Sequence, residues 1–305
     1  ILSNTIKGFS NYAKKIKPDL VVVHGDRIEP LACAIVCCLN NYKVAHIEGG
    51  ELSGTVDEIL RHSISKLSHL HFVTNNIAKN RLIQMGENKK NVFIIGSPDI
   101  DILISSNLPN IIKVKKRYNI EYKNYAICIF HPVTTEIVNL KKEINTLINS
   151  MIESKLNYII ILPNNDTGSE LIVKKYKKIR NNKNFRIIPS MRFEYYLTLL
   201  KNSDFIIGNS SSGVIEAPYY NIPSINIGSR QTNRVKKSIN MKDKNINNKN
   251  ILKHIKKSLT EKMKIKNYLH FGNGNSALNF IKILNNKEIW KISSQKSFVE
   301  IKKNK

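Results

Sequence analysis

The stretch from Asp19 to Asp101 reads DLVVVHGDRIEP at 19–30, VAHIEGGELSG at 44–54, DEILRH at 57–62 and FIIGSPDID at 93–101. Asp26 and Glu48 each come just after an apolar β-type run, and Asp57 stands at the start of a helical pattern. The carboxyl ends of parallel strands are where open α/β sheets bind their ligands. Carboxylates gathered there are costly unless they handle protons or positive charge. The stretch therefore indicates a proton-transfer enzyme.

Strand-like apolar runs alternate with amphipathic helical patterns through most of the 305 residues. Such alternation predicts the α/β class, with parallel sheets covered by helices on both faces. The predicted strands are 20–24, 43–47, 70–74, 92–95, 125–130, 157–162, 185–188, 204–207 and 223–227. The predicted helices are 28–40, 57–67, 76–85, 136–154, 170–180, 193–201, 213–220 and 275–286.

A change in composition at 106–122 divides this pattern into two series. The segment SNLPNIIKVKKRYNIEY carries a proline, polar residues and a run of charge. We expect a first Rossmann-like domain at 1–110 and a second, nucleotide-binding domain at 111–272. We expect residues 273–305 to hold a helix that returns to the first domain, followed by a mobile tail beyond Lys291. A polar segment at 229–250 is expected to be irregular.

The bulk composition excludes several classes of function. The net charge of +26 would suit an anionic partner, but the lysines are scattered and not interleaved with aromatic residues, which argues against a nucleic-acid-binding face. No apolar run reaches the roughly 18–20 residues that span a bilayer, so no membrane partner is expected. Cys33, Cys37 and Cys38 share one predicted helix, and no histidine completes a zinc site beside them. We expect no metal and a reduced, cytoplasmic setting.

Two motifs in the first half admit a structural as well as a functional interpretation. In HGDR, Gly25 permits a sharp turn and Arg27 could fix a phosphate, but the aspartate could equally cap a helix. In VDEILRH, Asp57 and Arg61 lie one helical turn apart on one face. That spacing suits either a site or an exposed ion pair.

The second half carries candidate phosphate- and nucleotide-binding turns. FHPVTTE places His131 after a strand, and LPNNDTGSE places Asn164 after the next. FIIGNSSSGVIEAP runs from a strand through Ser210 and Ser211 into a helical pattern with Glu216. Backbone N–H groups and hydroxyls at such a turn can hold an anion, and a carboxylate one turn on can accept from ribose hydroxyls. A serine-rich helix cap would look similar.

Taken together, these motifs resemble the hydrolysing UDP-N-acetylglucosamine 2-epimerases of the sialic-acid and legionaminic-acid pathways. The resemblance runs from about Asp19 to Arg234 and rests on GDR, HIEGGELSGTVDEILRH, IGSPDID, HPVT, PNNDTGS, IGNSSSGVIEAP and INIGSRQ. It implies the B-type glycosyltransferase fold, with two Rossmann-like domains and a cleft between them. It implies catalytic roles for Asp26, Glu48, Asp57 and His131, and substrate-binding roles for Arg27, Arg61, Asn164, Ser210, Ser211 and Glu216.

The resemblance also implies a reaction and its partners. Elimination of UDP from a UDP-sugar would give a 2-acetamidoglucal, and addition of water would then release N-acetylmannosamine or a related manno sugar. No cofactor is needed, and a homo-oligomer, dimer or tetramer, is expected. Which carboxylate is the base, and which nucleotide sugar is used, stay open. A glycosyltransferase of the same fold and a non-catalytic nucleotide-sugar-binding module are the alternatives.

Compared with this family, the first domain is expected to be incomplete at its N-terminus. Roughly two strand–helix units, about 60–80 residues at 30 or more per unit, would lie outside the chain.

Overall fold

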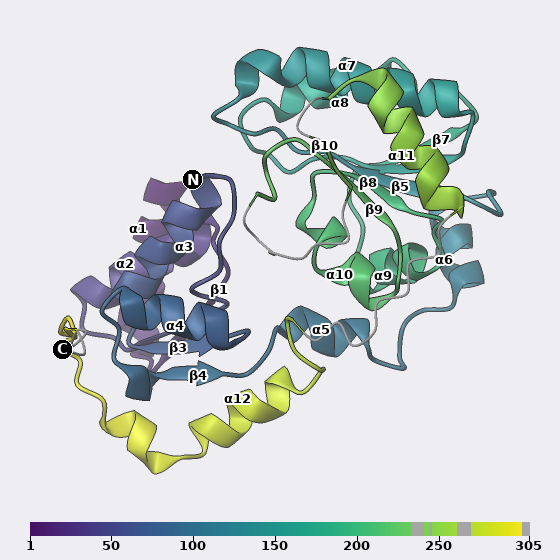
Figure 1. Cartoon of the computed structure of the whole chain (residues 1–305). Helices are drawn as coiled ribbons and strands as arrows, with labels where there is room; N and C mark the ends of the chain where they lie inside the picture. The colour runs from purple at the N-terminus through teal and green to yellow at the C-terminus, as the bar shows by residue number, and fades with distance from the viewer. Residues whose placement is uncertain (233–240, 244–245, 261–269, 301–305) are drawn as a thin grey trace, which may run out of the picture. The chain divides into compact units, whose positions relative to one another are not determined.

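The computed structural model of the chain describes residues 1–232, 241–243, 246–260 and 270–300 (Figure 1). The chain forms two compact units. Unit 1 comprises residues 1–52, 56–104 and 269–305, and unit 2 comprises residues 53–55 and 105–268. The chain therefore passes from unit 1 to unit 2 after Ile104. The sequence pattern places the end of the first domain at residue 110.

Unit 1 is built on a four-stranded parallel sheet in the order β1-β2-β3-β4. Its strands are β1 (Val21–His24), β2 (Val44–Ile47), β3 (Leu70–Val73) and β4 (Val92–Ile94). Its helices are α1 (Leu2–Ile16), α2 (Ile28–Leu39), α3 (Val56–Leu67), α4 (Asn76–Gln84), α5 (Pro98–Leu103), α12 (Ser276–Leu284) and the 3-10 helices η1 (Lys89–Asn91) and η3 (Lys287–Lys291).

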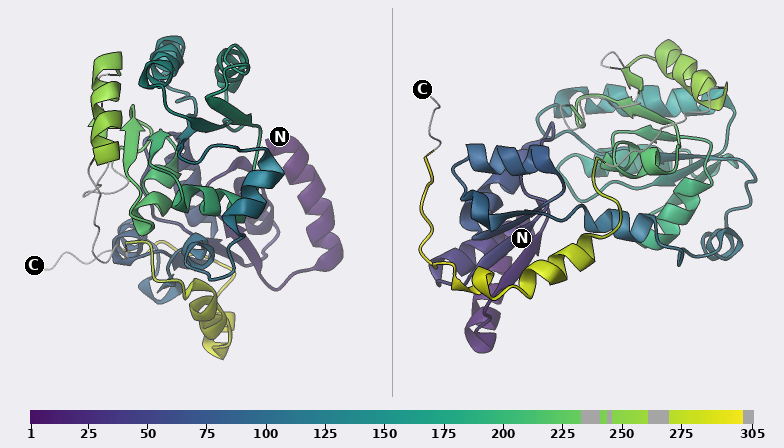
Figure 2. Two further views of the ribbon diagram at one scale, coloured as in Figure 1. Left: turned by 90° about the vertical axis from the view of Figure 1, so that its right-hand side faces the viewer. Right: turned by 60° about the horizontal axis from the view of Figure 1, so that its bottom comes forward.

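Both faces of this sheet are covered, as its apolar strands require. On one face Val23 and Val44 pack with Ile64 of α3 and with α2. On the opposite face Phe72 packs with residues of α12 and η3. The ribbon of α12 and η3 is yellow in Figure 2. The ring centroids of Phe72 and Phe280 of α12 are 4.6 Å apart. The helix at 276–284 therefore packs in unit 1.

The segment beyond Lys291 makes contacts that its composition does not predict. We expected it to be mobile because it offers few apolar side chains. Instead residues 292–300 lie against unit 1: the backbone N–H of Val299 donates to Gly86 O at 2.9 Å, and Lys296 makes buried contacts described below. Polar contacts therefore hold residues 292–300 against unit 1 in the structure, although the segment offers few apolar side chains to bury. Residues 301–305 lie outside the described part of the chain.

Unit 2 is built on a six-stranded parallel sheet in the order β10-β9-β8-β5-β6-β7. Its strands are β5 (Ala126–Ile129), β6 (Tyr158–Ile161), β7 (Phe185–Ile188), β8 (Ile206–Gly208), β9 (Ser224–Ile227) and β10 (Met241–Asp243). Its helices are α6 (Ile111–Tyr118), α7 (Ile137–Ser154), α8 (Ser169–Lys177), α9 (Phe193–Lys201), α10 (Glu216–Tyr219), α11 (Asn248–Thr260) and the 3-10 helix η2 (Ser211–Gly213). In Figure 1, α7, α8 and α11 cover one face of this sheet, and α6, α9 and α10 lie on the other.

The strand order of unit 2 reverses between β5 and β8, and this is the point where doubly wound sheets bind nucleotides. The two strands approach closely at Gly208, whose φ is +136°. A Cβ there would lie only 1.9 Å from the carbonyl oxygen of Ile129 on β5. Glycine is therefore required at the end of β8.

In unit 2, the secondary structure of three segments differs from what the sequence pattern predicts. The region 106–122, expected as a boundary, contains α6, because its apolar positions bury Val114 while its lysines stay outside. The region 229–250, expected to be irregular, contains β10 and the start of α11; residues 233–240 and 244–245 lie outside the described part. The helix expected at 213–220 is divided into η2 and the four-residue α10, because Pro218 has no N–H to continue it.

The described helices include none that is long and apolar enough to cross a membrane.

Candidate active site

Asp26 and Glu48 stand at the carboxyl ends of neighbouring strands, β1 and β2. The backbone turns sharply at both places, with φ of +78° at Gly25 and +65° at Glu48. A left-handed conformation is uncommon for a glutamate and is kept only where the surroundings fix it. Here the Glu48 N–H donates to Phe72 O at 2.9 Å, across to β3. The fold thus directs both carboxylates out of the sheet at one edge.

Arg61 of α3 lies against the first of these carboxylates. Its side chain is only 2% exposed, and its guanidinium donates to the Asp26 carboxylate and, at 2.8 Å, to Glu51 O. The guanidinium stays charged at any physiological pH. The alternative of an exposed ion pair is therefore wrong for Arg61. Asp57 lies one turn earlier, half-buried in the first turn of α3, where a negative charge is favoured.

Glu48 has different partners. Its Oε2 accepts a hydrogen bond from His24 Nε2 at 3.0 Å, and its Oε1 accepts one from the Ser97 hydroxyl. The hydrogen bond to Glu48 raises the pKa of His24, burial opposes this, and the negative charges of Asp99 and Asp26 add to the rise. The second carboxylate therefore stabilises the protonated form of the histidine beside it.

A buried histidine supports the turn that carries Asp26. His46 is fully buried, and burial lowers its pKa to about 3, so its ring is neutral. Its Nδ1 lies 2.9 Å from Ser65 Oγ and its Nε2 lies 2.8 Å from Gly25 O. A carbonyl can only accept, so Nε2 carries the proton and Nδ1 accepts from Ser65. Gly49 keeps this arrangement open, because a Cβ there would lie 2.7 Å from Ser65 Oγ.

In unit 2 a pocket of about 280 Å³ lies at the carboxyl ends of the strands beside the switch point. Its lining includes five of the predicted residues: His131, Asn164, Ser210, Ser211 and Glu216. Apolar walls are supplied by Ile129, Ile161, Leu162, Met191, Phe193 and Tyr196.

His131 is held firmly at this pocket. Its backbone N–H donates to the Asn209 side chain at 2.7 Å, and its carbonyl accepts from the same side chain at 2.8 Å. Its Nδ1 accepts from the Asn164 N–H at 3.3 Å, which leaves the proton of a neutral ring on Nε2. The side chain is 7% exposed. His131 is therefore arranged to offer an Nε2–H donor.

The serine turn is shorter than the sequence indicates. The Ser212 N–H donates to Ser210 Oγ at 3.3 Å, and the serines enter η2 instead of a long helix, so any dipole contribution is small. Glu216 is only 5% exposed. The neighbouring Tyr196 donates or accepts a hydrogen bond with Ser212, and burial followed by the charge of Glu216 raises the pKa of Tyr196. A carboxylate in this pocket suits hydroxyl donors.

The structure assigns the predicted residues to two sets. Asp26, Glu48, Asp57, Arg61 and Arg27, the last at the N-cap of α2, belong to unit 1. The other five line the pocket of unit 2.

Sequence reasoning missed four supporting residues: His24, His46, Ser97 and Asn209. Each lies in a quoted motif within three positions of a strand end, which is the one signal that could have found it. Within the described residues there is no group of three or more His, Cys, Asp or Glu side chains that could hold a metal ion.

Comparison with known proteins bears on these two sets. Residues 1–285 match the family model described as UDP-N-acetylglucosamine 2-epimerase. The chain is 46% identical to a UDP-N-acetylglucosamine 2-epimerase of Neisseria meningitidis serogroup B, over 99% of the chain and 80% of that protein. It is 36% identical to the hydrolysing UDP-N,N'-diacetylbacillosamine 2-epimerase of Legionella pneumophila, over 90% of the chain and 73% of that protein.

Among solved structures, the chain is similar to the Methanocaldococcus jannaschii UDP-GlcNAc 2-epimerase in complex with UDP-GlcNAc and UDP. The TM-score is 0.78 at 24% identity, covering 93% of this chain and 80% of that one. This likeness confirms the predicted fold class, an α/β protein with parallel sheets in two Rossmann-like domains.

Proposed function

Because the chain belongs to the UDP-N-acetylglucosamine 2-epimerase family, we propose that it acts as a hydrolysing 2-epimerase on UDP-N-acetylglucosamine or a closely related nucleotide-linked acetamido sugar. The products would be UDP and N-acetylmannosamine, or the corresponding manno sugar. The name of the Neisseria relative, UDP-N-acetylglucosamine 2-epimerase, supports the proposed substrate. The name of the Legionella relative describes a hydrolysing enzyme and supports the proposed hydrolysis.

The observation that carries the proposal is the pair of carboxylates at neighbouring strand ends, each with its own basic partner. Inversion at carbon 2 needs one group to remove the proton and a second group to return one to the opposite face. Two carboxylates in different environments can divide these roles. Asp26 lies against Arg61, and Glu48 lies against His24 and Ser97.

The two pairs differ in whether the partner can release a proton. Arg61 cannot be deprotonated in the working pH range, so Asp26 has a fixed positive neighbour. His24 has a raised pKa and is 45% exposed, so the His24–Glu48 pair can exchange a proton with solvent. We assign the supply of the new carbon 2 proton to the His24–Glu48 pair and the removal of the original proton to Asp26.

The pocket of unit 2 fits the UDP moiety. Glu216 can accept from the ribose hydroxyls, and the hydroxyls of Ser210 and Ser211 can donate to the phosphates. The Nε2–H of His131 can donate to the departing oxygen of UDP, whose negative charge grows as the bond to carbon 1 breaks. We propose Arg27 as a further phosphate contact and Asp57 as a member of the acidic set.

The decisive experiment incubates the full-length enzyme with UDP-N-acetylglucosamine in heavy water and follows the products by proton NMR. Free UDP together with N-acetylmannosamine carrying deuterium at carbon 2 would support the proposal. A product that keeps UDP attached would show epimerisation without hydrolysis. Release of UDP without deuterium at carbon 2 would contradict the elimination chemistry. Diacetamido sugars linked to UDP or GDP are the next substrates to compare.

Two further properties follow from the proposal. We propose a cytoplasmic location, where nucleotide sugars are made and consumed, and a dimeric or tetrameric assembly. Fractionation of cells and light scattering on the purified enzyme would measure these properties directly.

A further inference from the structure

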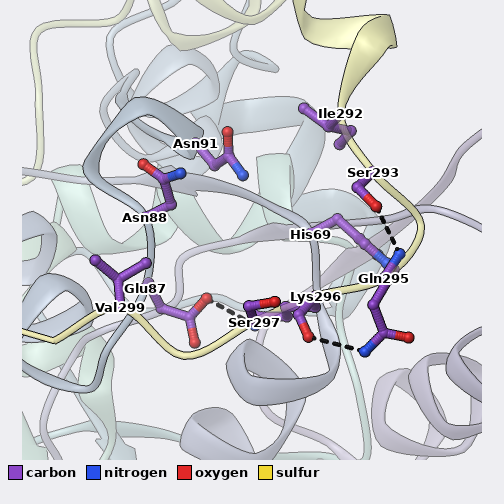
Figure 3. Close-up of a pocket in the computed structure, with 10 residues that line it drawn as sticks. All are labelled: His69, Glu87, Asn88, Asn91, Ile292, Ser293, Gln295, Lys296, Ser297 and Val299. Carbon is purple, nitrogen blue, oxygen red and sulfur yellow. Dashed lines mark hydrogen bonds and ion pairs between the residues drawn. The ribbon is translucent and has the colours of Figure 1, made fainter.

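Residues 292–300, here called the C-terminal strap, lie along the end of α3 and the connection from α4 to β4. Figure 3 shows the pocket of about 310 Å³ that the strap forms with His69, Glu87, Asn88 and Asn91. His69 Nε2 lies 3.0 Å from Ser294 O. The Ser294 contact precedes Lys296 in the chain, and the hydrogen bond from Val299 N–H to Gly86 O follows it. The strap is therefore held on both sides of Lys296.

Lys296 reaches a buried carboxylate. Its Nζ lies 2.6 Å from Glu87 Oε2, and the Glu87 side chain is only 1% exposed. Lys66 and His71 also donate to this carboxylate, at 2.7 and 2.9 Å. Burial raises the pKa of Glu87, but the hydrogen bonds from His71 and the two lysines outweigh it and bring the pKa to about 2. The anchor of the strap is therefore ionised at physiological pH.

The same ammonium group caps α3. Lys296 Nζ donates to the carbonyl oxygens of Ser65 at 3.0 Å, Lys66 at 2.8 Å and Ser68 at 2.7 Å. The last carbonyls of a helix lack partners within the helix, and a cation there is favoured by the helix dipole. The strap thus satisfies the C-terminal end of the helix whose N-terminal half carries Asp57 and Arg61.

A continuous set of hydrogen bonds leads from this cap to the acidic site. The carbonyl of Ser65 accepts from Lys296, and the hydroxyl of Ser65 donates to His46 Nδ1. The Nε2–H of His46 donates to Gly25 O, directly before Asp26.

We propose that Lys296 is a positioning residue for the acidic site, which it serves by fixing the end of α3 and, through Ser65 and His46, the turn that carries Asp26. The inference rests on the proposed function, because it assigns to a distant residue an effect on the chemistry of that site. A loss of this cap lets α3 shift along its axis, and small displacements of reacting groups cost much of their rate.

The test compares Lys296→Met with Lys291→Met. Lys291 also lies near the C-terminus, but its side chain is 70% exposed and pairs only with the exposed Glu288 in the contacts that the structure gives. We expect Lys296→Met to lower kcat roughly 10–100-fold with KM for UDP-N-acetylglucosamine within about twofold, and Lys291→Met to leave both unchanged. Lys296→Arg keeps the charge and several donors and should restore most of kcat.

A purely structural role would give a different result. Lys296→Met would then lower the unfolding temperature, but kcat per UDP-binding molecule, counted by calorimetric titration with UDP, would stay at the wild-type value. That outcome would overturn the proposal. Ser65→Ala interrupts the same set of hydrogen bonds, so the double variant with Lys296→Met should lose no more kcat than the larger single effect. Multiplied effects would also overturn it.

Nitrogen-15 NMR of His46 separates this inference from the proposed function. In the wild type we expect the neutral ring with its proton on Nε2, and in Lys296→Met a faster exchange of that proton. If the wild type does not release UDP, the proposed function fails while the His46 signal still decides whether Lys296 supports the turn. If the wild type is active and neither kcat nor the His46 signal changes in Lys296→Met, the inference alone fails.

Discussion

Replacement of Glu48 by glutamine should abolish most of the turnover while UDP binding survives. Glutamine has the shape of glutamate, so the left-handed turn and the packing at the end of β2 can remain. What is lost is the charge that accepts hydrogen bonds from His24, 3.0 Å away, and from Ser97. The substitution therefore removes a proton-transfer group without opening a cavity.

The expected size follows from these contacts. A positioned general acid or base contributes roughly 10²–10⁴-fold, so kcat should fall by that factor, which corresponds to about 3–5 kcal/mol of lost transition-state stabilisation. The pKa of His24 should also fall toward its ordinary value of 6.5, because the hydrogen bond to Glu48 is the main cause of its rise. The pocket that we propose for UDP consists of unit 2 residues, so the Kd for UDP should change less than about twofold, or 0.4 kcal/mol.

Three measurements check this prediction: the rate of UDP release, calorimetric titration with UDP, and NMR titration of the His24 ring. Glu29→Gln is the matched control, since Glu29 is an exposed glutamate in the first turn of α2. A fall in kcat of less than tenfold would refute the catalytic role of Glu48. A parallel loss of UDP affinity would mean that the substitution disturbs the fold, and an unchanged His24 pKa would contradict the pairing.

Gly208→Ala should destabilise the protein by about 2–6 kcal/mol in a urea titration, because the new Cβ would meet Ile129 O at 1.9 Å and the φ of +136° disfavours any side chain; a loss below 1 kcal/mol would count against this reading. Glu216→Gln should weaken UDP binding by roughly 10–100-fold, about 1.5–3 kcal/mol, with kcat at saturation nearly unchanged; equal UDP affinity in calorimetry would remove Glu216 from the site. Glu87 has a folded pKa of about 2 against an ordinary 4.5, so its stabilising effect is complete above pH 4.5 and is lost as the pH falls through 2. The urea midpoint should therefore decrease more between pH 7 and pH 3 in the wild type than in Glu87→Gln. An equal decrease in both proteins would contradict the pairing of Glu87 with His71.

The sequence contains enough information to find the two carboxylates and the pocket residues. Parallel strands bring their carboxyl ends to one edge, so a residue that follows an apolar run is expected at that edge whatever the rest of the chain does. Asp26, Glu48, His131 and Ser210 all follow from this rule. The nine predicted strands accordingly lie within about two residues of the observed bounds of β1 to β9, because alternation and length are local signals, whereas β10 was not predicted.

The partners of these residues could not be predicted in the same way. Helical spacing pairs Arg61 with Asp57, yet the guanidinium reaches Asp26, 35 positions away. Ser97 reaches Glu48 across 49 positions, and Lys296 reaches Ser65 across 231. Periodicity shows which face of an element a side chain occupies, but the choice among polar groups on that face depends on packing between elements. The contacts of the strap could not be predicted for the same reason, since its composition gives no sign of the carbonyl groups that Lys296 contacts.

The division of labour between the two carboxylates depends on those unpredictable partners. If both carboxylates had arginine partners, one could still accept the proton from carbon 2, but neither pair would include a histidine that takes up a proton from solvent and passes it on to the opposite face. If both had histidine partners, neither would have a fixed charge beside it. The combination of buried Arg61 with Asp26 and half-exposed His24 with Glu48 gives one carboxylate a neighbour of constant charge and the other a neighbour that exchanges protons. That asymmetry matches a reaction in which deprotonation and reprotonation take place on opposite faces of one carbon.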